Sequence, residues 1–337
     1  MSAPPNWSSA LEFIWGQYRT WSATSRAYQA QLSSWRRRVL GFGIAGAVIG
    51  TLSSQKFLLG DFGSRTLVAS WDLTVSTLLA LVSAALLALA TYFTTKILTP
   101  SNEGGWLRAR AVAESFKREA YLLLAQAPPY DGAITPATLE RVRNIARGVE
   151  DLDEEPVSED DKKKGMPTAL LAADDYVSGR VREQIGWYRR RAAEHRAAAK
   201  RIKDISLGLG VAAVLLGVLG ARWASAAAFI AVITTVTTSL ASYLYAGRYQ
   251  YLVVSYLAVA RRLEERILEW GYSGKTDAER KQFVRDCEDI FASENTAWMA
   301  ELSKREKAAE VPSGAATPPP ASLTSSAPAA PPPPANP

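Results

Sequence analysis

The sequence ASAAAFIAVITTVTTSLASYLY, at residues 224–245, contains no charged side chain. A second uncharged stretch, LTVSTLLALVSAALLALATYFTT, occupies residues 73–95. A bilayer core about 30 Å thick needs roughly 20 residues of helix to cross it. Both stretches are apolar or hydroxylated on every face, whereas buried helices of soluble proteins are usually shorter and amphipathic. The sequence therefore predicts an integral membrane protein.

Two further stretches, residues 39–55 and 205–219, complete the set of predicted spans. The first of them is the weakest, because Lys56 follows it closely, and the second needs a few flanking residues to cross a bilayer. Residues 220–224 leave little room between the last two spans, so these must form a tight hairpin. We expect an all-α membrane protein with four transmembrane helices arranged as two hairpins.

The distribution of Lys and Arg predicts the orientation of these helices. Within about 20 residues of the span ends, the termini and the central segment carry 18 such residues, and the two hairpin loops carry 3. Cytoplasmic flanks of transmembrane helices are enriched in Lys and Arg. The sequence therefore predicts a multi-pass protein of the cell (inner) membrane with both termini in the cytoplasm.

The composition argues against an enzyme. Cys287 and His195 are the only residues of their kinds, which leaves little for thiolate or imidazole chemistry and for metal sites. No Gly-rich phosphate loop, nucleophile elbow or paired-carboxylate pattern is present. We therefore expect no catalytic residue, no cofactor, no metal site and no nucleic-acid partner. The net charge of +6 suits anionic lipid or phosphate ligands without choosing between them.

An internal duplication relates the two predicted hairpins. Gly41-x-Gly43 aligns with Gly208-x-Gly210, and after each hairpin a similar apolar stripe leads to a turn, PPYDG at 128–132 and GYSGK at 271–275. A helix follows each turn, with Thr135 or Thr276 as its expected N-cap. The pair Ser9 and Glu12 has the spacing of a capping box that would begin the first helix.

Long cytoplasmic helices are expected before and after each hairpin. Before the third span, apolar residues recur at the spacing of a coiled-coil seam. They are Val177, Val181, Ile185, Tyr188, Ala192, His195, Ala199 and Ile202. The expected partner of this seam is the helix of residues 249–270, which leaves the membrane beside it.

The chain divides into two units, a linker and a tail. Residues 7–155 form the first unit, with spans at about 39–55 and 73–95, and residues 168–306 form the second, with spans at about 205–219 and 224–245. The charged residues 156–167 read as a solvated linker. Residues 307–337, rich in Pro and Ala, have too little apolar bulk to fold and are predicted to be disordered.

Small residues at fourfold spacing allow helices to approach closely within the membrane. They are Gly46 and Gly50 in the first span and Ala213 and Gly217 in the third. Packing within one hairpin and oligomerisation between chains both explain this spacing, and the first explanation is favoured.

A hydroxylated stripe of Thr234, Thr238 and Ser242 marks one face of the fourth span. This stripe either faces another helix or lines a wet path in an oligomer. Ionisable residues are missing from the middle of every span, which argues against a coupled transporter but permits a weakly selective pore.

A basic collar lies where the first and third spans enter the membrane. We use this name for Arg36, Arg37, Arg38, Lys200, Arg201 and Lys203. Such a collar is typical of a topology and lipid-headgroup signal.

The second unit closes with FVRDCEDIFASENTAWMAEL at residues 283–302, which places Glu288, Glu294 and Trp298 on one helix. With the preceding stalk and two-helix hairpin, this arrangement resembles the SLATT family over residues 177–302. SLATT domains are two-transmembrane effector domains associated with SMODS and SLOG modules in bacterial conflict systems. The first unit looks like a divergent second copy without the closing tryptophan, which would make the chain a tandem of SLATT units.

The resemblance implies a membrane effector that forms an oligomeric pore or disrupts the membrane when a cytoplasmic signal activates it. It also implies a partner protein of nucleotide signalling, and it supplies no catalytic residues. The alternative is a non-conducting membrane scaffold, whose helical stalks and Pro-rich tail recruit cytoplasmic partners.

Overall fold

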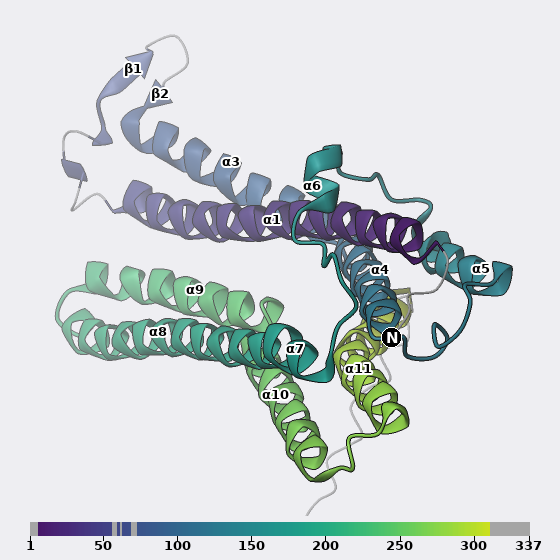
Figure 1. The fold of residues 1–337 in the computed structure, drawn as a ribbon. Helices are drawn as coiled ribbons and strands as arrows, with labels where there is room; N and C mark the ends of the chain where they lie inside the picture. Colours follow the sequence, from purple (N-terminus) through teal and green to yellow (C-terminus); the bar gives the residue numbers. More distant parts are fainter. Residues whose placement is uncertain (1–5, 56–58, 61–62, 69–72, 311–337) are drawn as a thin grey trace, which may run out of the picture.

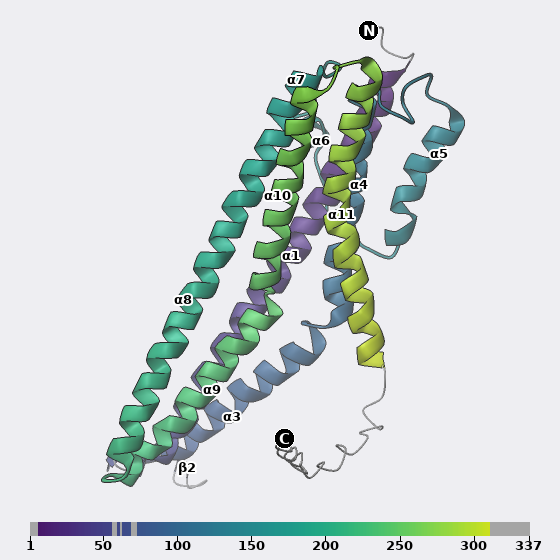
Figure 2. The ribbon, with the colours of Figure 1, turned by 90° about the horizontal axis from the view of Figure 1, so that it is seen from below.

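The structure is a computed structural model, and it describes residues 6–55, 59–60, 63–68 and 73–310. Helices dominate these residues and pack into one elongated body (Figure 1). Two helical hairpins form one end of this body, and a bundle of helices forms the other (Figure 2). We refer to them as the hairpin end and the bundle end.

The first half of the chain begins with α1, a helix of 48 residues (Trp7–Ser54). A short antiparallel ribbon of β1 (Thr66–Val68) and β2 (Leu73–Thr74) leads into α3 (Val75–Lys96). α4 (Pro100–Leu124), α5 (Pro136–Asn144) and the 3₁₀-helix η2 (Ile145–Val149) follow. The side chains of Thr74, Thr99 and Thr135 each accept a hydrogen bond from the backbone N–H three residues later and so cap α3, α4 and α5.

The second half begins with the short helices α6 (Glu159–Lys163) and α7 (Ala173–Tyr176). α7, the π-helix η3 (Val177–Arg182) and α8 (Glu183–Gly220) form one continuous helical segment of 48 residues. α9 (Ala224–Ala246), α10 (Tyr249–Tyr272) and α11 (Asp277–Glu310) complete the fold. The cap predicted at Thr276 is confirmed, because its hydroxyl accepts from the Glu279 N–H.

A sharp elbow of two residues, Gly247 and Arg248, separates α9 from α10. Arg248 adopts the left-handed conformation with φ of 49°, which few residues other than glycine adopt. A Cβ added at Gly247 would lie 2.4 Å from the ring of Tyr249, so this ring would have to move to admit a side chain there. This tight geometry fixes the direction in which α10 leaves α9.

One hydrophobic core fills the bundle end. It is built from the start of α1, from α4, from the first half of α8, and from α10 and α11. Leu11, Phe116, Leu123, Leu263 and Val284 are each 1% exposed or less. Contacts of α1 with α9 and of α4 with α11 join the two halves of the chain.

The partner predicted for the apolar seam lies beside it. α10 packs against α8, and the Tyr256 ring lies 5.5 Å from the rings of both Trp187 and Tyr188. His195 sits on the same seam, with its ring 5.5 Å from that of Tyr249. The supercoil itself stays a prediction.

Three of the described helices are long and apolar enough to cross a membrane. They are Val75–Lys96 and the apolar parts of Ala173–Gly220 and Ala226–Tyr272, which correspond to the predicted second, third and fourth spans. The second span was predicted to begin at Leu73, but Leu73 and Thr74 form β2 and the helix begins at Val75. Residues 39–55 fall in the last turns of α1 and are not among these candidates. The first span therefore stays a prediction.

The structure differs in part from three local predictions. The capping box at Ser9 is wrong, because α1 already begins at Trp7 and its N-cap residue is Asn6. The linker of residues 156–167 is largely exposed, but it contains α6 and runs along α1, where Arg19 Nε donates to the Asp161 carbonyl. The predicted disordered tail begins at 307 within α11, and its residues 311–337 lie outside the described residues.

Candidate functional site

The predicted small residues of the first hairpin face the neighbouring helix of the same chain. A Cβ added at Gly50 would lie 2.6 Å from Ser83 Oγ, and one at Gly46 would lie 2.9 Å from the Leu87 side chain. Ser83 Oγ also donates to the Gly46 carbonyl at 2.7 Å. These residues let α1 and α3 approach closely within one chain.

The small residues of the second hairpin pack more loosely. Ala213 is half-buried, and a Cβ added at Gly217 would meet Ile230 of α9 only at 3.9 Å. A Cβ at Gly220 would lie 3.2 Å from Ala227, next to the turn. The α8–α9 hairpin is therefore tight at its tip and more open along its length.

The hydroxylated stripe of α9 lies on the outside of the chain. Thr234, Thr238 and Ser242 are all exposed, and the Thr234 hydroxyl donates to the Ile230 carbonyl of its own helix at 2.9 Å. A hydroxyl that donates to a carbonyl of its own helix has used its donor, but its oxygen can still accept a hydrogen bond on the outer face of α9. A path lined by these residues needs a second copy of the chain.

The membrane half of α8 exposes large apolar side chains. Leu207 and Val218 are each 70% exposed and Val214 is 68% exposed, and Trp223 in the turn after α8 is 61% exposed. A soluble surface rarely carries a continuous apolar patch of this kind. This face is suited to lipid or to another protein chain.

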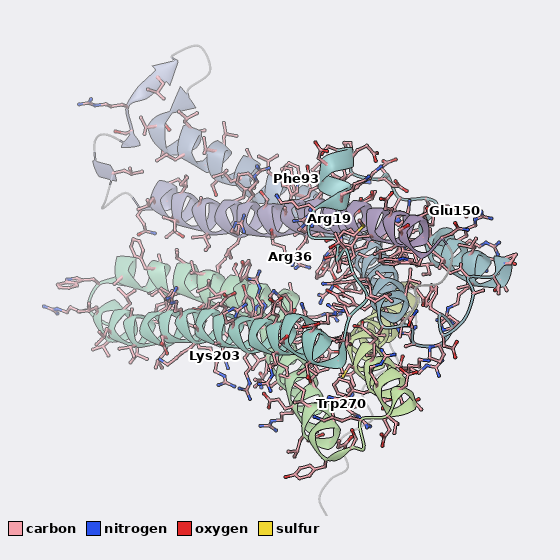
Figure 3. All side chains as sticks on the ribbon, in the orientation of Figure 1. Arg19, Arg36, Phe93, Glu150, Lys203 and Trp270 are labelled. Atoms are coloured by element: carbon pink, nitrogen blue, oxygen red, sulfur yellow. The ribbon has the colours of Figure 1, made fainter. Side chains whose placement is uncertain are left out.

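The basic collar is divided between the two hairpins. Arg36 forms an ion pair with Glu103 at the start of α4, and the Arg38 guanidinium lies 4.7 Å from the Trp35 ring centroid. Arg36 lies between α1 and the second hairpin, whereas Lys203 lies on the opposite side of α8 (Figure 3). Arg37 and Arg201 are exposed on α1 and α8, and Lys200 pairs with Asp204. The structure therefore does not bring the six residues of the basic collar into one cluster.

A buried ion pair joins η3 to α11 at the bundle end. Arg180 and Glu288 are 3% and 0% exposed, and two guanidinium nitrogens lie 3.1 Å from the two carboxylate oxygens. The Tyr176 hydroxyl donates to the same carboxylate at 2.9 Å. The guanidinium also lies between the rings of Tyr121 and Phe291, 4.4 Å from each centroid. We call these five residues the buried charge cluster.

The charge state of this cluster follows from its surroundings. Burial lowers the pKa of Arg180, but the charge and hydrogen bonds of Glu288 outweigh burial and leave this pKa raised. Burial and the charge of Glu288 raise the pKa of Tyr176 well above its ordinary value. Tyr176 therefore remains a hydrogen-bond donor, and Arg180 remains a cation that needs its partner.

The π-helix η3 explains how Arg180 reaches the core. π-helical turns are rare and are often found at functional sites. Val177, Arg180 and Val181 of η3 are all buried. The wider turn allows this arginine to enter the core together with the two valines of the apolar seam.

A second group of charges attaches α4 to α11. Glu119 is 3% exposed and accepts hydrogen bonds from Tyr130 at 2.8 Å and Arg141 at 2.9 Å. Arg118 lies 3.3 Å from Glu119 and also pairs with Asp289 of α11 at 2.5 Å. α11 is thus held by ion pairs to both halves of the chain.

Cys287, beside Glu288, provides a natural probe of α11. It is fully buried, and burial followed by the charge of Glu288 raises the pKa of its thiol. Because the thiolate is the reactive form, N-ethylmaleimide at pH 8 is expected to leave the native chain unlabelled and to add one group per unfolded chain. Mass spectrometry measures this directly, and rapid labelling of the native chain would contradict the described position of α11.

Two family models match the chain. Residues 176–298 match the model SLATT_1, described as SMODS and SLOG-associating 2TM effector domain 1. This range contains α8, α9, α10 and the buried Arg180–Glu288 pair, and it extends into α11, where the side chains of Glu294 and Trp298 lie outside the described ones. Residues 18–137 match DUF4231, a protein family of unknown function. A tandem of SLATT units is not confirmed, because a different model matches the first half. The search of curated proteins and the search of solved structures found no match.

Proposed function

We propose that this chain is a membrane effector of a bacterial conflict system, which assembles as a homo-oligomer and opens a path across the cell membrane. The observation that carries the proposal is the contrast between its two ends. The bundle end buries most of its large apolar residues in one core, whereas α8 turns a row of large apolar side chains outward and α9 turns a hydroxyl stripe outward. The match of residues 176–298 to a two-transmembrane effector domain supports the same function.

The proposal includes four spans. The 48 residues of α1 extend about 72 Å at 1.5 Å per residue, enough for a cytoplasmic stalk followed by a crossing. The tips of both hairpins lie at the same end of the body, so a membrane that contains one hairpin also meets the other (Figure 1). The excess of Lys and Arg on the flanks supports cytoplasmic termini in the inner membrane.

A duplication of one helical unit is part of the proposal. The helical segments of 48 residues at 7–54 and 173–220 correspond in order. So do α3 and α9, with 22 and 23 residues, and α4 and α10, with 25 and 24 residues. The two family models also cover corresponding elements. These correspondences support two related hairpins, each with its own coiled-coil-like stalks.

The buried charge cluster is the proposed restraint on the hairpins. It ties η3, which continues into the membrane helix α8, to α4 and α11. A partner that displaces α11 would therefore free the stalk of the second hairpin. We propose that this partner is a protein of nucleotide signalling, and that the chain itself has no enzymatic activity.

Dye release from liposomes tests the proposal. The full chain is reconstituted around a small trapped dye, and Glu288→Gln replaces the unknown trigger because it breaks the buried ion pair. We expect the variant to release the dye at least several-fold faster than the wild type, and the rate to rise more steeply than the protein density, as oligomers require.

A non-conducting scaffold makes the opposite prediction. In that alternative, the helical stalks and the tail recruit cytoplasmic partners. Neither the wild type nor Glu288→Gln then releases dye at any protein density. Protease protection confirms that both proteins are inserted to the same extent. An absence of release from fully inserted Glu288→Gln protein would reject the pore and favour the scaffold.

A further inference from the structure

A groove lies against the elbow between α9 and α10, on the side of α8. Its volume is about 550 Å³, within the usual range of small-molecule sites. The polar and aromatic residues that line it are Lys203, Tyr245, Arg248, Tyr249, Gln250 and Tyr251. Ala199 and Leu244 provide an apolar wall.

Positive charge enters this groove from two separate helical segments. Lys203 comes from α8, and Arg248 is placed by the left-handed elbow, which Gly247 makes possible. The residues that line the groove include no carboxylate.

The depth of the groove matches the cytoplasmic headgroup region of the proposed membrane. Lys203 lies two residues before the predicted third span, and Tyr245 is the last residue of the fourth. Tyr245 is 75% exposed and Tyr251 is 39% exposed. Tyrosine is enriched at membrane interfaces, where its ring meets the acyl chains and its hydroxyl meets the headgroups.

We propose that this groove binds the phosphodiester headgroup of an anionic phospholipid, held between Lys203 and Arg248. The acyl chains lie along Leu244 and the exposed face of α9. A lipid bound there bridges α8 and the elbow and so stabilises the direction of α10. The inference rests on the proposed membrane orientation and does not depend on pore formation.

Lipid retention by the purified full chain tests this site. Native mass spectrometry in detergent counts the phosphatidylglycerol and phosphatidylcholine molecules, with identical acyl chains, that remain bound. We expect a clear preference for phosphatidylglycerol in the wild type. The variant Lys203→Gln/Arg248→Gln is expected to lose it, with affinity about tenfold lower or more, because a hydrogen bond to the charged headgroup is lost at each position.

The matched control is Lys200→Gln/Arg201→Gln, which also removes two positive charges, but from the part of the basic collar outside the groove. We expect this control to keep most of the preference. Arg248→Lys restores a cation at the elbow and is expected to recover most of the affinity. Melting temperatures without added lipid show whether any variant is simply less stable.

Three results would overturn the proposal. Equal losses in both double variants would show general surface attraction without a specific site. Equal retention of both lipids by the wild type would remove the preference for an anion. Complete displacement of phosphatidylglycerol by millimolar glycerol 3-phosphate would assign the groove to a soluble phosphate ligand. Each readout is independent of dye release, so failure here is distinct from failure of the proposed pore.

Discussion

Replacing Glu288 with glutamine is expected to lower the free energy of unfolding of the bundle end by about 3 kcal/mol or more, because removing one partner of a buried ion pair typically costs about 3–5 kcal/mol. Arg180 would remain a cation in a site where it is only 3% exposed. A guanidinium does not escape this cost by losing its proton. Denaturant unfolding of the detergent-solubilised chain, followed by tryptophan fluorescence, measures the loss.

A variant without either charge separates the ion pair from general damage to the core. Arg180→Met/Glu288→Leu removes both charges and is expected to be more stable than Glu288→Gln, because apolar replacement of a whole buried pair is often neutral. Glu269→Gln breaks the exposed pair with Arg266 and is expected to cost about 1 kcal/mol or less. A double variant less stable than Glu288→Gln would contradict this role of the pair.

Faster modification of Cys287 should accompany this loss of stability. In Glu288→Gln the neighbouring thiol is expected to react with N-ethylmaleimide faster than in the wild type, because α11 separates from the bundle more often. An unchanged labelling rate in a destabilised variant would locate the damage elsewhere than at α11.

The long apolar helices and several of their boundaries follow from local sequence. Uncharged stretches of more than 20 residues predicted two of the three candidate spans directly. Thr135 was predicted as a helix N-cap, and the structure confirms that α5 begins directly after it. The spacing of apolar residues before the third span also identified the helix beside which α10 lies. Each of these signals depends on neighbours within one or two helical turns.

The buried charge cluster depends on contacts that local patterns do not encode. Arg180 is paired with a residue 108 positions away, and Tyr121 comes from the other half of the chain. The resemblance drew attention to Glu288 without its partner. The sequence did contain one signal for the position of Arg180. This charged residue lies between Val177 and Val181, two residues of the apolar seam that was predicted to be buried. The π-helical turn that turns Arg180 inward has no comparable sequence signal.

Changing Thr234, Thr238 and Ser242 together to leucine, in the Glu288→Gln background, is expected to reduce dye release to that of protein-free liposomes. The three side chains share the exposed face of α9, and leucine removes the three hydroxyl acceptors of the stripe. Apolar constrictions of this kind close a pore by excluding water. Release kinetics and chemical cross-linking of the reconstituted chain measure conduction and assembly separately.

The matched control changes Thr91, Thr94 and Thr95 of α3 to leucine in the same background. These hydroxyls are also exposed and bonded to carbonyls of their own helix, so the change in volume and polarity is nearly the same. Release that survives in this control and disappears in the α9 variant assigns the path to α9. Equal release from the α9 and α3 variants would mean that the hydroxyl stripe faces lipid. Loss of cross-linking in the α9 variant alone would mean that the stripe is an assembly surface. If unfolded protein caused the leakage, the α9 and α3 variants would release dye equally. A difference between them therefore shows that the Glu288→Gln protein conducts through a defined structure.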